Sequence, residues 1–377
     1  MATHPAEIDI SQDVVALTAA LVGFPSVSRG EAALADAIEA ALSTRAHLLV
    51  RRSGNTIVAS TNLGRAERVV IAGHIDTVPS SGNEAPVLVA EGEQAPVAGV
   101  DGSLIASEDR LYGLGSCDMK GGLAVALHLA ATIEAPNRDV TYVFYDCEEI
   151  EAEFNGLKRI ADHHPDWIAA DFAVLMEPSN ATVEGGCQGT IRVDVRVPGR
   201  RAHTARGWMG QNAIHGAGEV LARLAAYEPR QVEIDGLVYR EGLQAVFIRG
   251  GVAGNVVPDE CVVTVNHRFA PSRSAAEAEE HLRELFAGFE VTVVDAVDGA
   301  LPGLTRPAAQ DFVREVGKLP NPKLGWTDVA RFSALGVPAV NFGPADPALA
   351  HAPNEFVPLA QIREVADVMT RWLGEAL

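Results

Sequence analysis

The chain has 377 residues, which is longer than one hydrophobic core usually supports, so two domains are predicted. It is 47% hydrophobic and 21% charged, and no apolar stretch reaches the roughly 18–20 residues that a membrane span needs. The formal net charge of −20 argues against nucleic acid and anionic membranes as partners, because both would be repelled. The four cysteines form no CxxC pair and the first residues do not resemble a signal peptide, so we expect a cytoplasmic protein.

Helical and strand periodicities alternate in the first half of the chain. They predict helices at 13–24, 31–43 and 121–133, and strands at 68–75, 140–145 and 172–176. Strands that alternate with helices are typical of the α/β class, in which a mainly parallel, mixed sheet is covered by helices on both faces.

The pattern changes between residues 185 and 294. The segment "GTIRVDVRVPG" alternates strictly, with Ile191, Val193 and Val195 on one face, as in a half-exposed antiparallel strand. The order that follows is β-α-β-β-α-β, which is typical of a small α+β domain. The first pattern then returns, with a helix at 327–335, a strand at 339–342 and a closing helix at 359–377. We therefore predict an α/β domain of residues 1–184 and 295–377, with an α+β domain of residues 185–294 inserted into it.

Histidine and carboxylate residues follow the predicted strands. They are His74, Asp76, Asp118, Asp146, Glu148, Glu149, Glu177 and His351. One histidine and one aspartate at a strand end are also typical of an ordinary polar loop. However, the carboxyl ends of parallel strands meet at one edge of a sheet, and several acids there would repel one another unless a cation neutralised them. Histidine and carboxylate ligands suit zinc, with cobalt or manganese as substitutes.

Five motifs occur in order: "GHIDTVP", "GLGSCDMKGG", "DCEEIEAEFNG", "MEPSN" and "HAPNE". With them the chain resembles the co-catalytic zinc amidohydrolases, a family that includes aminoacylases, acetylornithine deacetylases, carboxypeptidases and succinyl-diaminopimelate desuccinylases. The resemblance covers nearly the whole chain. It implies two zinc ions per subunit, a catalytic role for the α/β domain, a lid and dimerisation role for the inserted domain, and a homodimer.

The resemblance also implies roles for individual residues. His74 and Glu177 would hold one metal ion, Glu149 and His351 would hold the other, and Asp118 would bridge both. Asp76 would hydrogen-bond the second ring nitrogen of His74 and fix its tautomer. Glu148 would be the general base that takes a proton from the attacking water and returns it to the leaving amine.

The substrate expectations rest on the inserted domain. By resemblance, His203 would stabilise the oxyanion, reaching the site of the other subunit, although it could also be an ordinary surface histidine. Asn255 and Arg268 would contact substrate, with Arg192 and Thr327 as further candidates. The runs "GGCQGTIRV" and "CEEIEAEFNGL" are most similar to actinobacterial desuccinylases, which implies a small anionic N-acyl amino acid, N-succinyl-LL-2,6-diaminopimelate, as substrate.

Several alternatives remain open from the sequence. A deacetylase, an N-acyl-amino-acid hydrolase or a carboxypeptidase of the same family would share every metal ligand. A binding protein that had lost catalysis should lack a ligand or the base, yet all these positions are filled. A nucleotide-binding α/β protein should carry GxGxxG or GxxxxGK[ST] after a strand, and "GLGSCDMKGG" matches neither.

Overall fold

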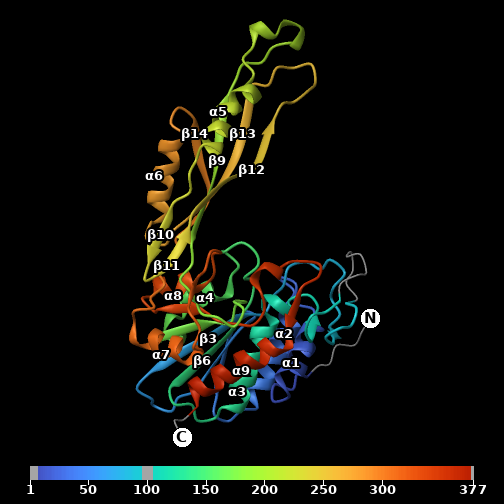
Figure 1. Cartoon of the computed structure of the whole chain (residues 1–377), viewed down its shortest axis with the longest axis vertical. Helices are drawn as coiled ribbons and strands as arrows, with labels where there is room; N and C mark the ends of the chain where they lie inside the picture. Colours follow the sequence, from blue (N-terminus) through green and yellow to red (C-terminus); the bar gives the residue numbers. More distant parts are fainter. Residues whose placement is uncertain (1–6, 96–104, 375–377) are drawn as a thin grey trace. The chain divides into compact units, whose positions relative to one another are not determined.

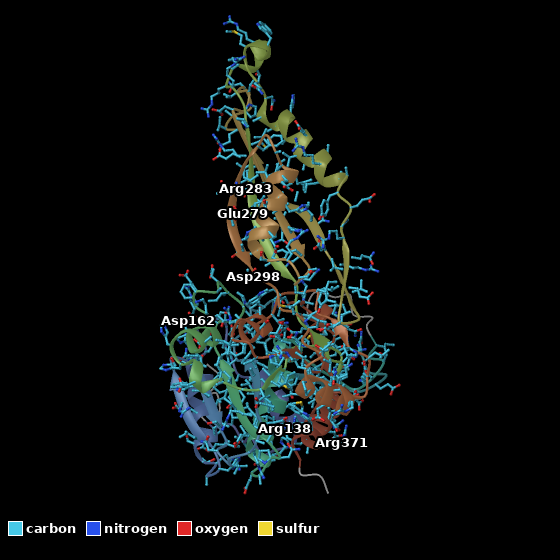
Figure 2. All side chains as sticks on the ribbon, turned by 90° about the vertical axis from the view of Figure 1, so that its left-hand side faces the viewer. Arg138, Asp162, Glu279, Arg283, Asp298 and Arg371 are labelled. Carbon is cyan, nitrogen blue, oxygen red and sulfur yellow. The ribbon has the colours of Figure 1, made fainter. Side chains whose placement is uncertain are left out.

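The computed structural model describes residues 7–95 and 105–374 (Figure 1). The chain divides into two compact units, which we call unit 1 (Met1–Gly185, Gly303–Asn321 and Arg331–Leu377) and unit 2 (Gly186–Pro302 and Pro322–Ala330). Unit 2 is thus larger than the predicted insertion. Backbone hydrogen bonds of 3.0 Å join Cys187 and Ala300, and the Trp326 indole donates to the carbonyl of Asp298 at 3.1 Å (Figure 2 labels Asp298).

Unit 1 is built on an eight-stranded mixed sheet. Its strands, in spatial order, are β1 (Leu49–Ser53), β2 (Thr56–Ser60), β6 (Asp139–Tyr145), β3 (Arg68–His74), β7 (Phe172–Leu175), β16 (Ala339–Asn341), β8 (Glu184–Gly185) and β15 (Asn321–Pro322). The central strands β6, β3, β7 and β16 run parallel, whereas β1 on β2, β2 on β6 and β8 on β16 are antiparallel. The predicted α/β class with a mainly parallel, mixed sheet is confirmed.

Helices pack against this sheet and against one another. They are α1 (Val14–Val22), α2 (Ala32–Ser43), α3 (Gly121–Thr132), α4 (Gly156–His163), α7 (Pro307–Val316) and α9 (Leu359–Leu373). Helix α8 (Val329–Ala334) begins in unit 2 and ends in unit 1. Helix α3 packs on β3 and β6 and also contacts α1 and α9, which explains why its sequence is apolar on every side. A Cβ atom at Gly122 would lie 1.9 Å from the carbonyl oxygen of Met176, so only glycine lets α3 begin this close to the end of β7.

Three short strands form a second sheet in unit 1: β4 (Val87–Val89), β5 (Arg110–Tyr112) and β17 (Phe356–Pro358). This sheet was not predicted, because three residues are too few to show an alternating pattern. Among the described residues, no helix combines the length and the apolar character that crossing a membrane requires.

Unit 2 contains an antiparallel sheet whose strands lie in the order β12 (Gly242–Gly250), β13 (Glu260–Phe269), β9 (Gly189–Pro198) and β14 (Glu290–Val297). Helices α5 (Ala213–Ala225) and α6 (Ala275–Leu285) bury the side chains of Ile191, Val193 and Val195 on one face of β9, as predicted. On the surface of α6, Glu279 and Arg283 form an ion pair of 2.7 Å (Figure 2).

The unpredicted element of unit 2 is a hairpin of β10 (Gln231–Ile234) and β11 (Leu237–Arg240). Asp235 and Gly236 form its turn, with φ angles of 51° and 80°. An Asp-Gly pair between alternating residues is a strong hairpin signal, so this element was readable from the sequence.

Candidate metal centre

The candidate metal centre lies at the carboxyl edge of the central parallel strands. His74 ends β3 and is in register with Tyr145, the last residue of β6. Glu148 and Glu149 follow β6 within four residues, and Glu177 follows β7 by two. The predicted convergence of strand ends therefore brings these side chains to one edge of the sheet.

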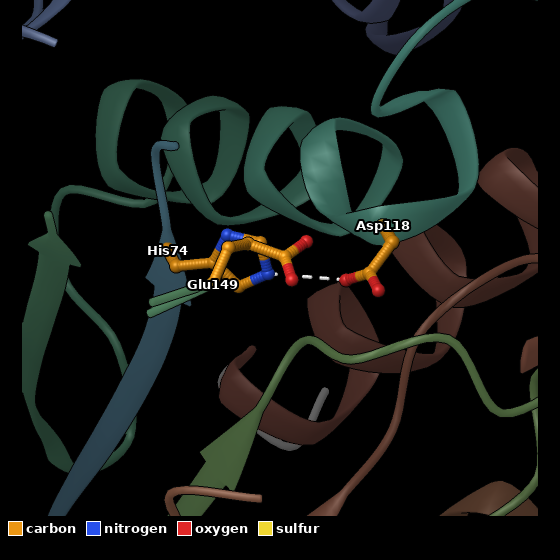
Figure 3. A group of neighbouring side chains, drawn as sticks. All are labelled: His74, Asp118 and Glu149. Carbon is orange, nitrogen blue, oxygen red and sulfur yellow. Dashed lines mark hydrogen bonds and ion pairs between the residues drawn. The ribbon is translucent and has the colours of Figure 1, made fainter. Parts of the chain in front are cut away.

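His74 is oriented by its own strand end. Its Nδ1 atom lies 3.0 Å from the backbone carbonyl oxygen of Asp76, so the carbonyl accepts the Nδ1 proton. Its Nε2 atom lies 3.0 Å from Oδ1 of Asp118, and Figure 3 shows the two side chains facing each other. The ring is buried, with 1% of its side chain exposed, so its orientation is fixed by protein contacts.

Asp118 faces a second histidine with its other oxygen. Oδ2 lies 3.5 Å from Nε2 of His351, and the same Nε2 atom lies 3.0 Å from the carboxylate of Glu149. Each carboxylate oxygen of Asp118 is thus directed at a different imidazole, which is the arrangement of a carboxylate that can bridge two cations.

The donor chemistry fits a cation. With Nδ1 of His74 donating to a carbonyl, the lone pair of Nε2 is directed at an oxygen that also carries lone pairs, so a proton or a metal ion has to lie between them. His74, Asp118 and Glu149 each offer one ligand atom, and these three atoms lie within 4.8 Å of one another (Figure 3). Imidazole nitrogen with carboxylate oxygen is a set that zinc accepts.

The pKa values reflect the same contacts. Hydrogen bonds to Asp118 and Glu149 raise the pKa of His351 to about 10. Burial alone would lower the pKa of His74, but hydrogen bonds to Asp118 and Asp76 raise it well above its usual value. The pKa of Asp118 is lowered despite burial, because both imidazoles stabilise its anion. A metal ion that binds His351 at neutral pH therefore has to displace a proton from this ring.

The carboxylate of Asp76 has a different main contact from the predicted one. It lies 3.5 Å from Nδ1 of His74, farther than the carbonyl oxygen of the same residue. Its oxygens accept the backbone N–H groups of Glu148 and Glu149 at 2.9 and 3.1 Å, and the hydroxyl of Ser28 at 2.8 Å. Asp76 thus holds the turn that carries both glutamates, in addition to orienting His74.

Two buried glutamates next to the metal centre, Glu31 and Glu355, were not predicted from the sequence. Glu31 accepts the backbone N–H of Cys147 at 3.2 Å, next to the turn that Asp76 holds. Glu355 accepts backbone N–H groups around Asp118, and burial together with the negative charge of Asp118 raises its pKa to about 7. The motif "HAPNE" contains Glu355, but the sequence alone does not reveal that its partners are backbone amides.

The predicted substrate residues of unit 2 fall into two groups. His203 and Asn255 lie together, because Thr204 donates to the carbonyl of Asn255 at 3.0 Å. Arg268 lies near the other end of β13. The eight residue-to-residue steps from Glu260 to Arg268 alone span about 27 Å of strand. One small molecule cannot contact Asn255 and Arg268 of the same chain, so the prediction that places both on one substrate needs two chains.

Arg268 and Arg192 share a face of the sheet. Arg192 is opposite Asn266 and Arg268 is opposite Thr190 in the register of β13 and β9, and opposed residues point the same way. Arg268 is half-buried, and within residues 7–95 and 105–374 the structure records no hydrogen bond or ion pair for its guanidinium. Burial lowers its pKa accordingly. Thr327 is buried, and its carbonyl accepts from the Cys187 thiol at 3.7 Å.

Comparison with known proteins identifies the family of the chain. The chain is 51% identical to a putative succinyl-diaminopimelate desuccinylase of Mycobacterium tuberculosis, over 97% of this chain and 99% of that one. It is 43% identical to a succinyl-diaminopimelate desuccinylase of Corynebacterium glutamicum, over 98% of both. A tripeptidase structure from Staphylococcus aureus shares the fold, with a TM-score of 0.76 and 19% identity over 96% of this chain and 97% of that one. The sequence profile of peptidase family M20/M25/M40 matches residues 70–375. The chain belongs to this family of metal-dependent hydrolases.

Proposed function

We propose that this protein is a zinc-dependent amide hydrolase that cleaves N-succinyl-LL-2,6-diaminopimelate to succinate and LL-diaminopimelate. The observation that carries the proposal is the placement of Asp118 between the Nε2 atoms of His74 and His351, at 3.0 and 3.5 Å. The substrate follows from the desuccinylases of M. tuberculosis and C. glutamicum, to which the chain is similar along nearly its whole length.

Two zinc ions would be held by five side chains. His74 and Glu177 would bind one ion, Glu149 and His351 the other, and Asp118 both. Glu177 is buried, and its negative charge contributes to the raised pKa of His74, which places it in electrostatic reach of that ring. When bound, zinc ions make water more acidic and polarise an amide carbonyl. Cobalt or manganese would be accepted by the same donors.

Glu148 would be the general base. Its backbone N–H donates to Asp76, so its position is fixed by the same carboxylate that fixes Glu149. The side chains of adjacent residues in an extended segment point in different directions. Glu149 could therefore bind metal while Glu148 accepts a proton from water. The protonated Glu148 would then donate to the nitrogen of the leaving amine.

Arg268 would bind a carboxylate of the substrate. Burial deprives the half-buried guanidinium of part of its hydration, and Asp295 acts on it only through its charge, so a bidentate carboxylate would supply hydrogen bonds that none of the described residues is recorded to make. Arg192, on the same face of the sheet, would bind a second carboxylate, and Thr327 would contact the substrate through its loop. The proposed substrate carries three carboxylates, so more than one arginine is expected.

His203 would stabilise the oxyanion in the site of a partner subunit. Its Nδ1 atom accepts the backbone N–H of Ala205 at 3.0 Å, so the neutral ring carries its proton on Nε2, and the residue is exposed. Arg268 lies near one end of β13, and His203 and Asn255 lie beyond its other end. A site that uses all three residues would therefore need His203 and Asn255 from a second chain.

A homodimer formed by unit 2 would supply that second chain. Strand β12 is an edge strand that exposes 64% of Phe247 and 53% of Ile248. Helix α5 packs beside it and exposes Ile214 and Leu221. An apolar edge strand next to an apolar helix surface is a suitable self-complementary interface, and pairing would also protect the unpaired backbone of β12.

Hydrolysis of N-succinyl-LL-diaminopimelate and N-acetylornithine by zinc-loaded protein, measured side by side, tests the proposal. We expect a strong preference for the succinyl compound. Preference for the acetyl compound would leave the metal centre intact and overturn the substrate assignment. Inactivity on both would overturn the proposed reaction.

A further inference from the structure

We propose that Glu355 is a positioning residue that fixes the metal ligand Asp118 and joins it to the loop of His351; this inference rests on the proposed function. Oε1 of Glu355 accepts the backbone N–H groups of Cys117 at 2.9 Å and of Asp118 at 3.0 Å. Oε2 accepts the N–H of Gly115 at 2.9 Å. One carboxylate thus holds three amides of the segment that presents Asp118.

This contact joins segments that are 237–240 residues apart in the sequence. Glu355 is buried, with 2% of its surface exposed, and its own carbonyl accepts the N–H of Gly113 at 3.2 Å. Four hydrogen bonds therefore connect residues 113–118 to Glu355. A buried carboxylate that receives several amide donors has its hydration replaced by the protein, so the contact persists without solvent.

The three N–H donors around the Glu355 side chain require an ionised carboxylate at this position. Three N–H donors converge on the side chain, and an ionised carboxylate offers only acceptors, with about four lone-pair directions. A glutamine of the same shape would turn its own NH₂ group toward at least one of these donors. Oε1 and Oε2 are both in use, so neither orientation of the amide would satisfy Gly115, Cys117 and Asp118 together.

The position of Glu355 in the chain gives this contact a functional consequence. His351 lies four residues before it, and Nε2 of His351 lies 3.5 Å from Oδ2 of Asp118. Asp118 thus contacts Glu355 through its backbone and His351 through its side chain, and the covalent chain from residue 351 to residue 355 closes the loop. Loss of the Glu355 carboxylate would keep every proposed metal ligand in the chain but would release the backbone of Asp118 from the segment that carries His351.

The test is the zinc affinity of metal-free wild type and of Glu355→Gln, measured by calorimetry and by competition with a chelator. We expect Glu355→Gln to bind zinc about 10–100-fold more weakly, as is typical when a group that orients a ligand is lost. The visible spectrum of cobalt-substituted protein should change as well, because it reports ligand geometry rather than stability.

Asp139→Asn is the matched control. Asp139 is also a buried carboxylate on backbone amides, those of Leu63 and Arg65 at 2.7 and 3.0 Å. It begins β6, whereas the metal centre lies beyond the last residue of that strand. Asp139→Asn should lower the melting temperature but keep the zinc affinity and cobalt spectrum of wild type.

The outcomes separate this inference from the proposed function. Wild type that binds no zinc would overturn both. If wild type binds zinc, and Glu355→Gln has the same zinc affinity and the same cobalt spectrum as wild type, only the role of Glu355 is overturned. If Glu355→Gln does not fold, amide hydrogen exchange of metal-free wild type decides: slow exchange at Gly115, Cys117 and Asp118 is required, and exchange at the rate of exposed loops contradicts the inference.

Discussion

The metal centre of unit 1 and the substrate-binding candidates of unit 2 differ in how their side chains are held. His74 and Asp76 are buried, and hydrogen bonds to the backbone or from it fix both. His203 and Asn255 are exposed at one end of the sheet of unit 2. The core of unit 1 therefore fixes His74 and Asp76 in advance, whereas the proposed contacts of His203 and Asn255 with substrate would form only when substrate or a second subunit is present.

The largest effect is expected from Glu148→Ala, which removes the proposed base from the preorganised unit. We expect kcat to fall about 10²–10⁴-fold because no side chain would accept the proton of the attacking water. Zinc content, measured by atomic emission, should stay at the wild-type level because Glu148 is not a proposed ligand. Loss of zinc from the variant would show that Glu148 binds metal instead.

His203→Ala tests the proposed oxyanion role of the exposed histidine of unit 2. We expect kcat to fall about 10²–10³-fold with little change in KM, because the lost hydrogen bond forms mainly with the developing oxyanion. Mixing this variant with Glu148→Ala should restore activity, since one site of a mixed dimer would contain Glu148 and the partner's wild-type histidine. Absence of recovery, with mixed dimers detected by native mass spectrometry, would place His203 outside the partner's site.

Arg268→Lys should have a smaller effect. It preserves the charge but removes the paired N–H donors, and one charge-assisted hydrogen bond contributes ~1.5 kcal/mol, so we expect KM to rise about tenfold. Steady-state kinetics with the succinyl substrate provides the measurement. Arg196→Lys is a matched control, because Arg196 lies on the same strand face as Arg192 but pairs with Glu260 and Glu290. Equal kinetics of the two variants would remove Arg268 from the substrate site.

The smallest signal is the release of protons when zinc binds. The pKa of His351 is raised to about 10, so this ring is protonated in metal-free protein at pH 8, and the pKa of His74 is raised as well. Zinc needs the neutral rings, and we therefore expect release of at least the proton of His351 and an affinity that increases with pH up to about 10. Calorimetry in two buffers of different ionisation enthalpy measures the number of protons released. An affinity that does not change between pH 7 and 9 would contradict it.

Much of the fold could be predicted from chain periodicity, and so could the convergence of polar side chains at one edge of the sheet, whereas the individual metal-binding roles rested on the family resemblance. Apolar β-branched runs indicate the parallel strands, and parallel strands end at one edge of a sheet, which is enough to predict that His74, Glu149 and Glu177 converge. The hairpin at Asp235 and Gly236 was missed although its turn signal is strong, because strands of four residues show too little alternation to stand out beside the longer ones.

Other features depend on three-dimensional geometry. Glu31 and Glu355 act on backbone amides, which nearly every residue has, so no pairing of residue types indicates their partners. The separation of Asn255 from Arg268 follows from the length of β13, and a strand rise of about 3.3 Å per residue is enough to predict it once the strand is recognised.

Anomalous diffraction at the zinc edge from crystals of the zinc-loaded protein tests the central claim most directly. We expect two peaks about 3.5–4 Å apart, with Asp118 between them, one contacting His74 and Glu177 and the other contacting Glu149 and His351. A single peak, or peaks bound by other residues, would contradict the proposed metal centre.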